Sequence, residues 1–448
     1  MKQKLLALLV MALFVPLAAS AYDACIDGIY YNIVKKAKQA TVTYGDNKNG
    51  TYSGDVVIPE TVVYDGVTYD VIGIGEYAFS GCTLTSLTIP RTVNIIEAPN
   101  YTSGNMATEF AKSIGSLHIS DLAAWCHIEF SDAQASPIRF AGTFYLNKTA
   151  ITDLVIPNSV TAVNSYAFYG AKMLTSVKLS DSVESIGAGA FQNCSGLTSV
   201  IWGKGITSVG ERAFHECENI KRVDISDLKA WLSIDFGISH VSMWGTTDYI
   251  QCPLYYAGHL YLNGVELKDV VVPDGIETLS SHAFENFSAM TSLVIPDGVK
   301  KFKTRLTYSG QATGDPFCGI SDLPNLKSVR IGTGLVSIDI SDCAALTSVK
   351  VGDGSIDISI SECPLLTDIQ IDNAKKVSIS KCDNLTEISP KKINTEAFDL
   401  SYLNKVTKLQ ISDNTSSIYV SSCPNLTTIV LGMGIEDNGN GRSYARYA

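Results

Sequence analysis

Short alternations of apolar and polar residues recur along the chain and predict strands rather than helices. In Leu346-Thr-Ser-Val349-Lys-Val351 and in Ile356-Asp-Ile358-Ser-Ile360, the apolar side chains fall on one face of an extended segment. Such a pattern places one face of a strand on a core and the other in water. Gly352-Asp-Gly354 separates the two segments. We therefore expect a coil of two short strands joined by a tight turn.

This coil recurs after residue 320. Its leading apolar residues are Leu326, Leu346, Leu366, Leu385, Val406 and Leu426, at steps of 20, 20, 19, 21 and 20 residues. A coil of this length is too short for two strands and a helix. The sequence therefore predicts a nearly helix-free β-solenoid over residues 318–434.

A longer repeat precedes it over residues 77–317. Ala167-Phe168, Ala190-Phe191 and Ala213-Phe214 lie 23 residues apart, and further copies are Ala78-Phe79 and Ala283-Phe284. The three added residues fit a short 3₁₀ turn, in which Phe fills a corner and Ala permits close approach. Coils this short cannot bury their own apolar face, so they must stack into a solenoid.

Two enlarged units, residues 117–157 and 223–273, interrupt the period. They share Ile119-Ser-Asp-Leu-Ala-Ala-Trp125 with Ile225-Ser-Asp-Leu-Lys-Ala-Trp231, and a later Tyr-Leu-Asn at residues 145–147 and 261–263. Ser or Asp at the start of each motif can cap a short helix that carries Trp inward. The tryptophans either anchor the core or form an aromatic platform for a ligand.

The ends of the chain differ from the repeats. Residues 1–21 have Lys2 and Lys4, an apolar run and Ala19-Ser-Ala21, which is typical of a cleaved export signal. Residues 22–76 contain turn signals between alternating segments and predict a β-hairpin cap. Residues 435–448 predict a mobile polar tail. No later apolar stretch is long enough to predict a transmembrane segment.

The composition and the missing motifs exclude several classes of function. Apolar residues make up 46% and charged residues 18%, with a formal net charge of −11. This composition excludes global disorder and argues against nucleic acid as a partner. Zinc-type Cys and His spacing, a Walker loop, a G-x-S-x-G elbow and an H-E-x-x-H helix are all missing from the sequence. We therefore expect no enzymatic activity, no metal and no cofactor.

The cysteines follow the repeat. Cys343, Cys363, Cys382 and Cys423 share a repeat position with Leu323 and Leu403. Because Cys and Leu occupy the same repeat position, the position favours a small buried apolar side chain, and the cysteines are expected to be free thiols. A disulfide ladder in an oxidising compartment is the alternative, because neighbouring coils bring Cα atoms within bonding range.

Two sets of residues are candidates for binding. The first is an outward polar strip expected on one sheet of the 20-residue coils: Lys327, Arg330, Lys350, Gln370, Lys408 and Gln410. The second is a pair of ten-residue segments, 101–110 and 308–317, which break the period and run from Tyr to Phe. Their candidate contacts are Tyr101, Met106, Tyr308 and Gln311. Loops that break a solenoid's period often carry its function.

Tyr77-Ala-Phe79, Leu84-Thr-Ser-Leu-Thr-Ile-Pro90 and Ser176 to Gly187 resemble the BspA-type leucine-rich repeats of bacterial surface proteins. The resemblance covers nearly the whole mature chain, and the array after residue 320 departs from it. It implies a β-dominated leucine-rich-repeat solenoid and an association with adhesion. We therefore expect an exported, non-enzymatic protein that binds an extracellular protein or glycan. The alternative is a structural spacer at the cell surface. The ligand, the anchoring mode and the oligomeric state stay open.

Overall fold

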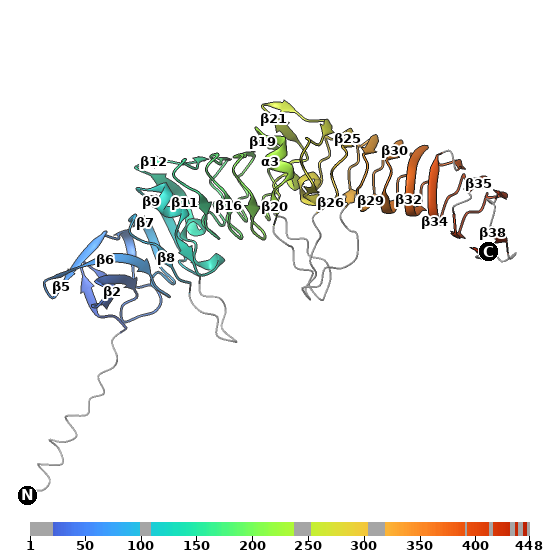
Figure 1. Ribbon diagram of the computed structural model, residues 1–448. Coiled ribbons are helices and arrows are strands. Elements are labelled where there is room, and N and C mark those ends of the chain that lie inside the picture. Colours follow the sequence, from blue (N-terminus) through green and yellow to red (C-terminus); the bar gives the residue numbers. More distant parts are fainter. Residues whose placement is uncertain are drawn as a thin grey trace, which may run out of the picture. The chain divides into compact units, whose positions relative to one another are not determined.

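The computed structural model describes residues 21–98, 109–236, 252–302, 319–389, 392–411, 415–430, 435–437 and 442–445 (Figure 1). The chain divides into two compact units, Met1–Ile151 and Thr152–Ala448. Each unit is a set of coils whose strands pair mainly in parallel with those of the next coil.

Unit 1 holds two sheets. The first runs β1 (Ala24–Ile26), β2 (Ile29–Val34), β3 (Gln39–Thr43), β6 (Val67–Ile74), β8 (Ile95–Ile96) and β10 (Glu129–Phe130), with β5 (Thr61–Tyr64) paired to β6. The second runs β4 (Ser53–Val57), β7 (Thr83–Ile89), β9 (Ser113–Ile119), β11 (Ala141–Leu146) and β12 (Thr149–Ala150). Helix α2 (Leu122–Cys126) and the 3₁₀ turns η1 (Ala133–Ala135) and η2 (Pro137–Phe140) lie between β9 and β11.

The N-terminal hairpins continue directly into the coils. β1, β2 and β3 pair antiparallel, as expected of a cap, and β3 then pairs in parallel with β6. However, β4 already pairs in parallel with β7. Parallel pairing therefore begins at β3 and continues at β4, inside the segment 22–76 that the sequence predicts to be a β-hairpin cap.

The first part of unit 2 contains the 23-residue coils. Its longer sheet runs β13 (Asp153–Val155), β15 (Ser176–Lys178), β17 (Ser199–Ile201), β19 (Arg222–Ile225), β21 (Leu260–Leu262) and β22 (Val265–Glu266). The shorter strands are β14 (Ala162–Val163), β16 (Ser185–Ile186), β18 (Ser208–Val209) and β20 (Asp235–Phe236), followed by the pair β24 (Thr278–Leu279) and β26 (Lys301–Phe302). The helical segments are α3 (Leu228–Leu232), α4 (Leu254–Ala257) and η3 (Ser281–Phe284).

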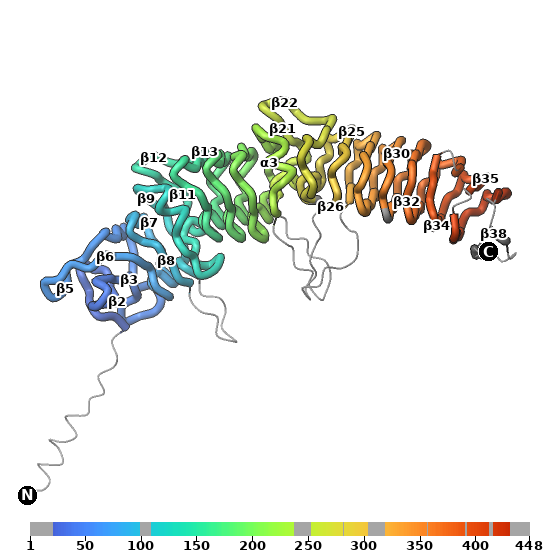
Figure 2. The backbone as a smooth tube through the Cα atoms, in the orientation of Figure 1, coloured from blue at the N-terminus to red at the C-terminus, as the bar shows by residue number. Residues whose placement is uncertain are grey.

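The second part of unit 2 contains only strands among the described residues after 318. One sheet runs β23 (Asp269–Val271), β25 (Ser292–Ile295), β28 (Ser328–Ile331), β30 (Ser348–Val351), β32 (Asp368–Ser380), β34 (Ile393–Ser401), β36 (Ser417–Ser421), β39 (Arg442–Ala445) and β38 (Ile435–Asp437). β27 (Gly319–Ser321), β29 (Ser337–Ser341) and β31 (Ser355–Ser361) join it through β32, while β33 (Glu387–Ile388), β35 (Lys408–Gln410) and β37 (Thr428–Val430) form a separate sheet. Figure 2 shows these coils as successive turns of one stack.

The sequence predicts a mobile polar tail over residues 435–448, and the described part of this segment consists of the short strands β38 and β39. β38 and β39 pair antiparallel with each other, and β39 pairs with β36 of the preceding coil. The backbone therefore continues the sheet beyond the last coil, which gives an otherwise open edge strand a hydrogen-bonding partner.

The Ala-Phe corners form the core of the 23-residue coils. The rings of Phe168, Phe191 and Phe214 stack with centroids 5.3 and 5.2 Å apart and planes within 13° of parallel. The alanines before them are fully buried. In these copies the corner is a hydrogen-bonded turn, and the expected 3₁₀ geometry is found at η3. A single repeated dipeptide thus sets the distance between coils.

An Asp-x-Val-x-Pro motif marks the start of three sheets. It occurs at residues 55–59, 153–157 and 269–273, and β4, β13 and β23 are the edge strands in which it begins. Asp55 accepts a hydrogen bond from Ser86 and Asp269 accepts one from Ser292, each at 2.6 Å. The serine bond holds the pKa of Asp269 below its usual range. A charged residue on an edge strand also disfavours pairing with foreign strands.

Candidate binding surface

One outward position recurs along the first strands of unit 2 from β13 to β32, and we call it the first-strand row. Its members are Val155, Lys178, Ile201, Asp224 and Tyr261 in one sheet, and Val271, Val294, Arg330, Lys350 and Gln370 in the next. The residue before each is a buried Val, Leu or Ile of the core. Because parallel strands are about 4.8 Å apart, neighbouring members project side by side.

Three of the predicted binding residues lie together in this row. Arg330 pairs with Lys350, and Lys350 pairs with Gln370, on β28, β30 and β32. Arg330 and Lys350 are exposed, and Gln370 is half-buried and donates to Asp372 at 3.1 Å. Lys327 is exposed at the turn before β28, where its carbonyl accepts a hydrogen bond from the hydroxyl of Thr347. The structure therefore brings these four residues into one neighbourhood.

Lys408 and Gln410 do not continue this strip, although the sequence predicts one shared sheet. They lie on β35, which pairs with β33 and β37 in the separate sheet. The cause lies in β32. Gly352-Asp-Gly354 allows the previous coil to turn, whereas Asp372-Asn373 has no glycine, so β32 runs as one strand from Asp368 to Ser380. Its pairing with β34 shifts register after Ile371, and the row ends there.

Tyr101, Met106, Tyr308 and Gln311 lie outside the described residues, as do most residues of the two segments that contain them. Their role in binding stays a prediction.

The sequence reasoning missed a charged and aromatic cluster in the same row. The Arg222 guanidinium donates to both carboxylate oxygens of Asp224, at 2.6 and 2.7 Å, and lies 3.8 Å from the centre of the Tyr261 ring. Its hydrogen bond with Asp224 raises the pKa of Arg222. A guanidinium held by a carboxylate on one side and a ring on the other has little freedom to move. We call these three residues the Arg222 cluster.

Unit 1 has a related arrangement at the corresponding position. The rings of His118 on β9 and Tyr145 on β11 stack at 4.6 Å with planes 7° apart, and His118 Nε2 lies 2.8 Å from the hydroxyl oxygen of Ser116. Each enlarged unit therefore carries an ordered aromatic ring on the strand next to the edge of its sheet. The signal was in the sequence, because Tyr145 and Tyr261 both lie in the shared Tyr-Leu-Asn motif.

The tryptophans of the enlarged units are core anchors. Trp125 and Trp231 are each 1% exposed, and the indole N–H of Trp231 donates to the carbonyl of Ala283 at 3.1 Å. Asp121 and Asp227 cap α2 and α3, as predicted, by accepting from the backbone N–H three residues later. Buried rings cannot form a platform for a ligand.

The described cysteines are free thiols. Cys343, Cys363 and Cys382 are buried and donate to the carbonyls of Ser341, Ser361 and Ser380, at 3.2 to 3.4 Å. Cys194 and Cys217 similarly donate to the carbonyls of Phe168 and Phe191. Burial raises the pKa of Cys126 to about 12. These thiols therefore fill small core positions and satisfy corner carbonyls.

The described residues lack both a metal-binding cluster and a membrane-spanning helix. They contain no group of three or more His, Cys, Asp or Glu side chains arranged to hold a metal ion. Among the same residues, no helix has both the length and the apolar character needed to cross a bilayer.

Residues 66–115, 141–234 and 257–311 match the family model of the BspA type leucine rich repeat region, in six copies. These segments are BspA-type leucine-rich repeats. The match ends at residue 311, so the 20-residue coils lie outside it, and the matched segments cover less of the mature chain than the sequence resemblance predicts. The BspA-type repeats and the shorter coils nevertheless share one sheet, because β25 pairs with β28.

Several solved structures of bacterial proteins are similar to this chain. A leucine rich cell surface protein from Faecalibacterium prausnitzii has 18% identity and a TM-score of 0.38, and the match covers 92% of this chain and 94% of that one. A leucine-rich repeat protein from Bacteroides ovatus has 19% identity and a TM-score of 0.39, covering 92% and 91%. The pneumococcal vaccine antigen PcpA has 14% identity and a TM-score of 0.42, covering 92% and 99%. No curated protein matches the chain.

Proposed function

We propose that this protein is an exported, non-enzymatic interaction module that binds an extracellular protein or glycan at the cell surface. The observation that carries the proposal is the first-strand row of unit 2. It presents Asp224 and Tyr261 of the Arg222 cluster on neighbouring strands of one sheet, and Arg330, Lys350 and Gln370 in register on the next sheet. Arg and Tyr are enriched where proteins meet partners, and rigid repeats offer extended surfaces for such contacts.

Two further observations support the proposal. The export signal predicted over residues 1–21 would place the mature chain outside the cytoplasm. The coils are BspA-type repeats over much of the chain, and such repeats bury their consensus residues in the core. The outward positions are therefore free to vary with the partner.

The test is binding of the mature chain, residues 22–448, to an array of extracellular-matrix proteins and glycans. Arg330→Ser/Lys350→Ser and, separately, Tyr261→Ala should weaken saturable binding at least tenfold. Lys204→Ser/Lys300→Ser is the matched control. It removes the same charge from two exposed ion pairs outside the row and should leave affinity within about twofold.

Saturable binding that neither row variant changes would place the interaction elsewhere on the chain. No saturable binding to any array member would instead favour a structural spacer without a ligand of its own.

A further inference from the structure

Two cations lie side by side in the first-strand row of unit 2. Arg330 on β28 and Lys350 on β30 are partners in the parallel register, and both side chains are exposed. Parallel strands lie about 4.8 Å apart, so the two positive charges project next to each other from one face. Like charges on facing positions of a sheet repel each other. An anion that contacts both side chains would replace this repulsion with attraction.

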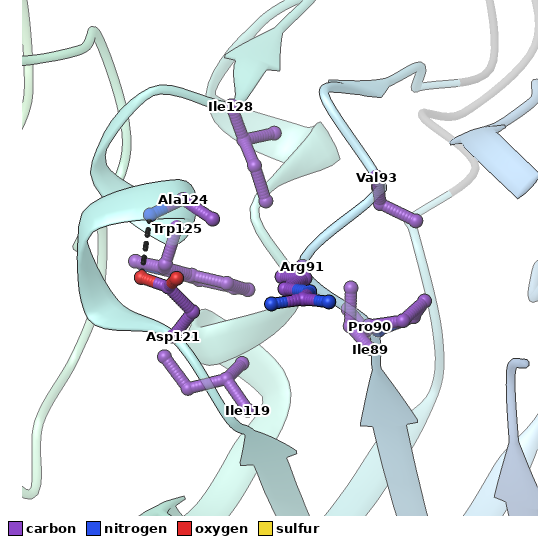
Figure 3. Close-up of a pocket in the computed structure, with 9 residues that line it drawn as sticks. All are labelled: Ile89, Pro90, Arg91, Val93, Ile119, Asp121, Ala124, Trp125 and Ile128. Atoms are coloured by element: carbon purple, nitrogen blue, oxygen red, sulfur yellow. Dashed lines mark hydrogen bonds between the residues drawn. The ribbon is translucent and has the colours of Figure 1, made fainter. Parts of the chain in front are cut away.

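The pair has no counter-charge of its own. Among the residues that the structure describes, no carboxylate lies within ion-pair distance of either cation. Other arginines do have a partner. Arg91, whose side chain Figure 3 shows, pairs with Glu60 at 3.1 Å. The guanidinium of the Arg222 cluster is likewise held by a carboxylate. Arg330 and Lys350 therefore differ from these neutralised surface cations.

The carboxylates of β32, the next strand, have partners elsewhere. Asp368 pairs with Lys392 at 3.4 Å, and Asp372 accepts a hydrogen bond from Gln370 at 3.1 Å. Neither carboxylate neutralises the two cations on the strands before it. A counter-charge for these cations would therefore come from a ligand.

Two hydroxyl groups lie beside the cations. Ser328 and Ser348 are partners across β28 and β30, two residues before Arg330 and Lys350, and they are half-buried. Side chains two residues apart on a strand point to the same face. Arg offers a planar fork to two oxygens of one anion, Lys adds a compact charge, and a Ser hydroxyl donates or accepts. The four side chains thus fit an oxyanion that has hydroxyl groups next to it.

The spacing of these groups favours a sugar polymer over an acidic peptide. Equivalent side chains on neighbouring strands are about 4.8 Å apart, which is close to the length of one pyranose unit along a polysaccharide. Acidic side chains on one face of an extended peptide would be about 6.6 Å apart, because each residue rises about 3.3 Å. Nucleic acid fits poorly, because its binding depends on many phosphate contacts and two cations supply few.

We propose that Ser328, Arg330, Ser348 and Lys350 form a subsite for the carboxylate or sulfate group of an acidic polysaccharide. The inference rests on the proposed function and names the class of its glycan. It can fail while the proposed function holds, because a protein or a neutral glycan bound at the Arg222 cluster needs none of these four residues. Failure of the proposed function itself would instead leave every member of the matrix array unbound.

The probes are three oligosaccharides of equal length, titrated into residues 22–448 by isothermal titration calorimetry at low salt. Hyaluronan carries carboxylates, sulfated dextran carries sulfates, and dextran is neutral. We expect saturable binding of at least one charged oligosaccharide and at least tenfold weaker binding of dextran. Physiological salt should weaken the charged interaction, because it screens exposed charges.

Three double variants locate the site. Arg330→Ser/Lys350→Ser should weaken binding of the charged oligosaccharide at least tenfold. Lys178→Ser/Lys204→Ser is the matched control, because it removes two exposed charges from other coils of unit 2, and it should leave the affinity within about twofold. Ser328→Ala/Ser348→Ala keeps both cations and should weaken binding by about threefold or more. Circular dichroism verifies that each variant is folded.

An acidic peptide of the same length, oligoglutamate, tests the choice of polymer. It should bind at least tenfold more weakly than the charged oligosaccharide. Binding of this peptide as tight as that of the oligosaccharide would overturn the assignment to a polysaccharide. Unchanged affinity of Arg330→Ser/Lys350→Ser, equal binding of dextran, or no saturation with either charged oligosaccharide would overturn the subsite itself.

Discussion

At the scale of single residues, most of the core follows from the repeat pattern. Phe at the corner, Ala before it and Cys in the corner column were assigned to the interior from their repeat positions, and the structure buries them except Cys423, which is half-buried. The Arg222 cluster could not be derived in the same way. Its geometry depends on Tyr261, which the enlarged unit brings beside Arg222 from 39 positions further along the sequence.

Chemical labelling tests whether the buried cysteines are free thiols that do not react in the folded protein. Only thiolates react readily, and burial raises the pKa of Cys126, Cys194 and Cys252 above the ordinary thiol range. At pH 8 we therefore expect iodoacetamide to label Cys25, which is exposed, and to spare these three until the chain is unfolded. Peptide mapping by mass spectrometry reads each site. A disulfide between Cys343 and Cys363 in the native protein would contradict the assignment of free thiols.

At the scale of elements, regular repeats predict regular strands, and the exceptions come from local turn chemistry. The Ala-Phe corners and the helix-free coils could be predicted, because each repeat has the same apolar face to bury against its neighbours. The fusion within β32 could not, because it reflects the loss of a glycine turn in one coil. The parallel pairing of β3 and β4 could not be predicted from the sequence either, because the pattern of these strands resembles that of a hairpin.

Gly196 tests how closely the coils must approach. A Cβ at this position would lie 2.1 Å from the carbonyl oxygen of Lys172 and 2.8 Å from that of Leu174, both in the preceding coil. Since backbone atoms cannot move aside cheaply, Gly196→Ala should lower the free energy of unfolding by about 1–3 kcal/mol. Ser195→Ala is the adjacent control on an exposed side chain and should change it by less than about 0.5 kcal/mol. Urea unfolding followed by circular dichroism compares the two, and equal midpoints would refute the argument.

At the scale of the whole molecule, the sequence predicted the leucine-rich-repeat architecture, and the repeat family and the stacked coils confirm it. The partner could not be predicted, because consensus residues describe the core and the outward positions follow no consensus. Arg330, Lys350 and Gln370 were found only because their column alternates with buried valines and isoleucines.

The central claim is that the chain is a binding module rather than a spacer. The most direct measurement is an equilibrium titration of residues 22–448 against immobilised matrix proteins and glycans, at low and at physiological salt. We predict saturable binding to at least one of them that persists at physiological salt, because ordered guanidinium, amide and aromatic groups add contacts beyond long-range charge. Binding that is lost at physiological salt, or that never saturates for any member of the array, would contradict the claim.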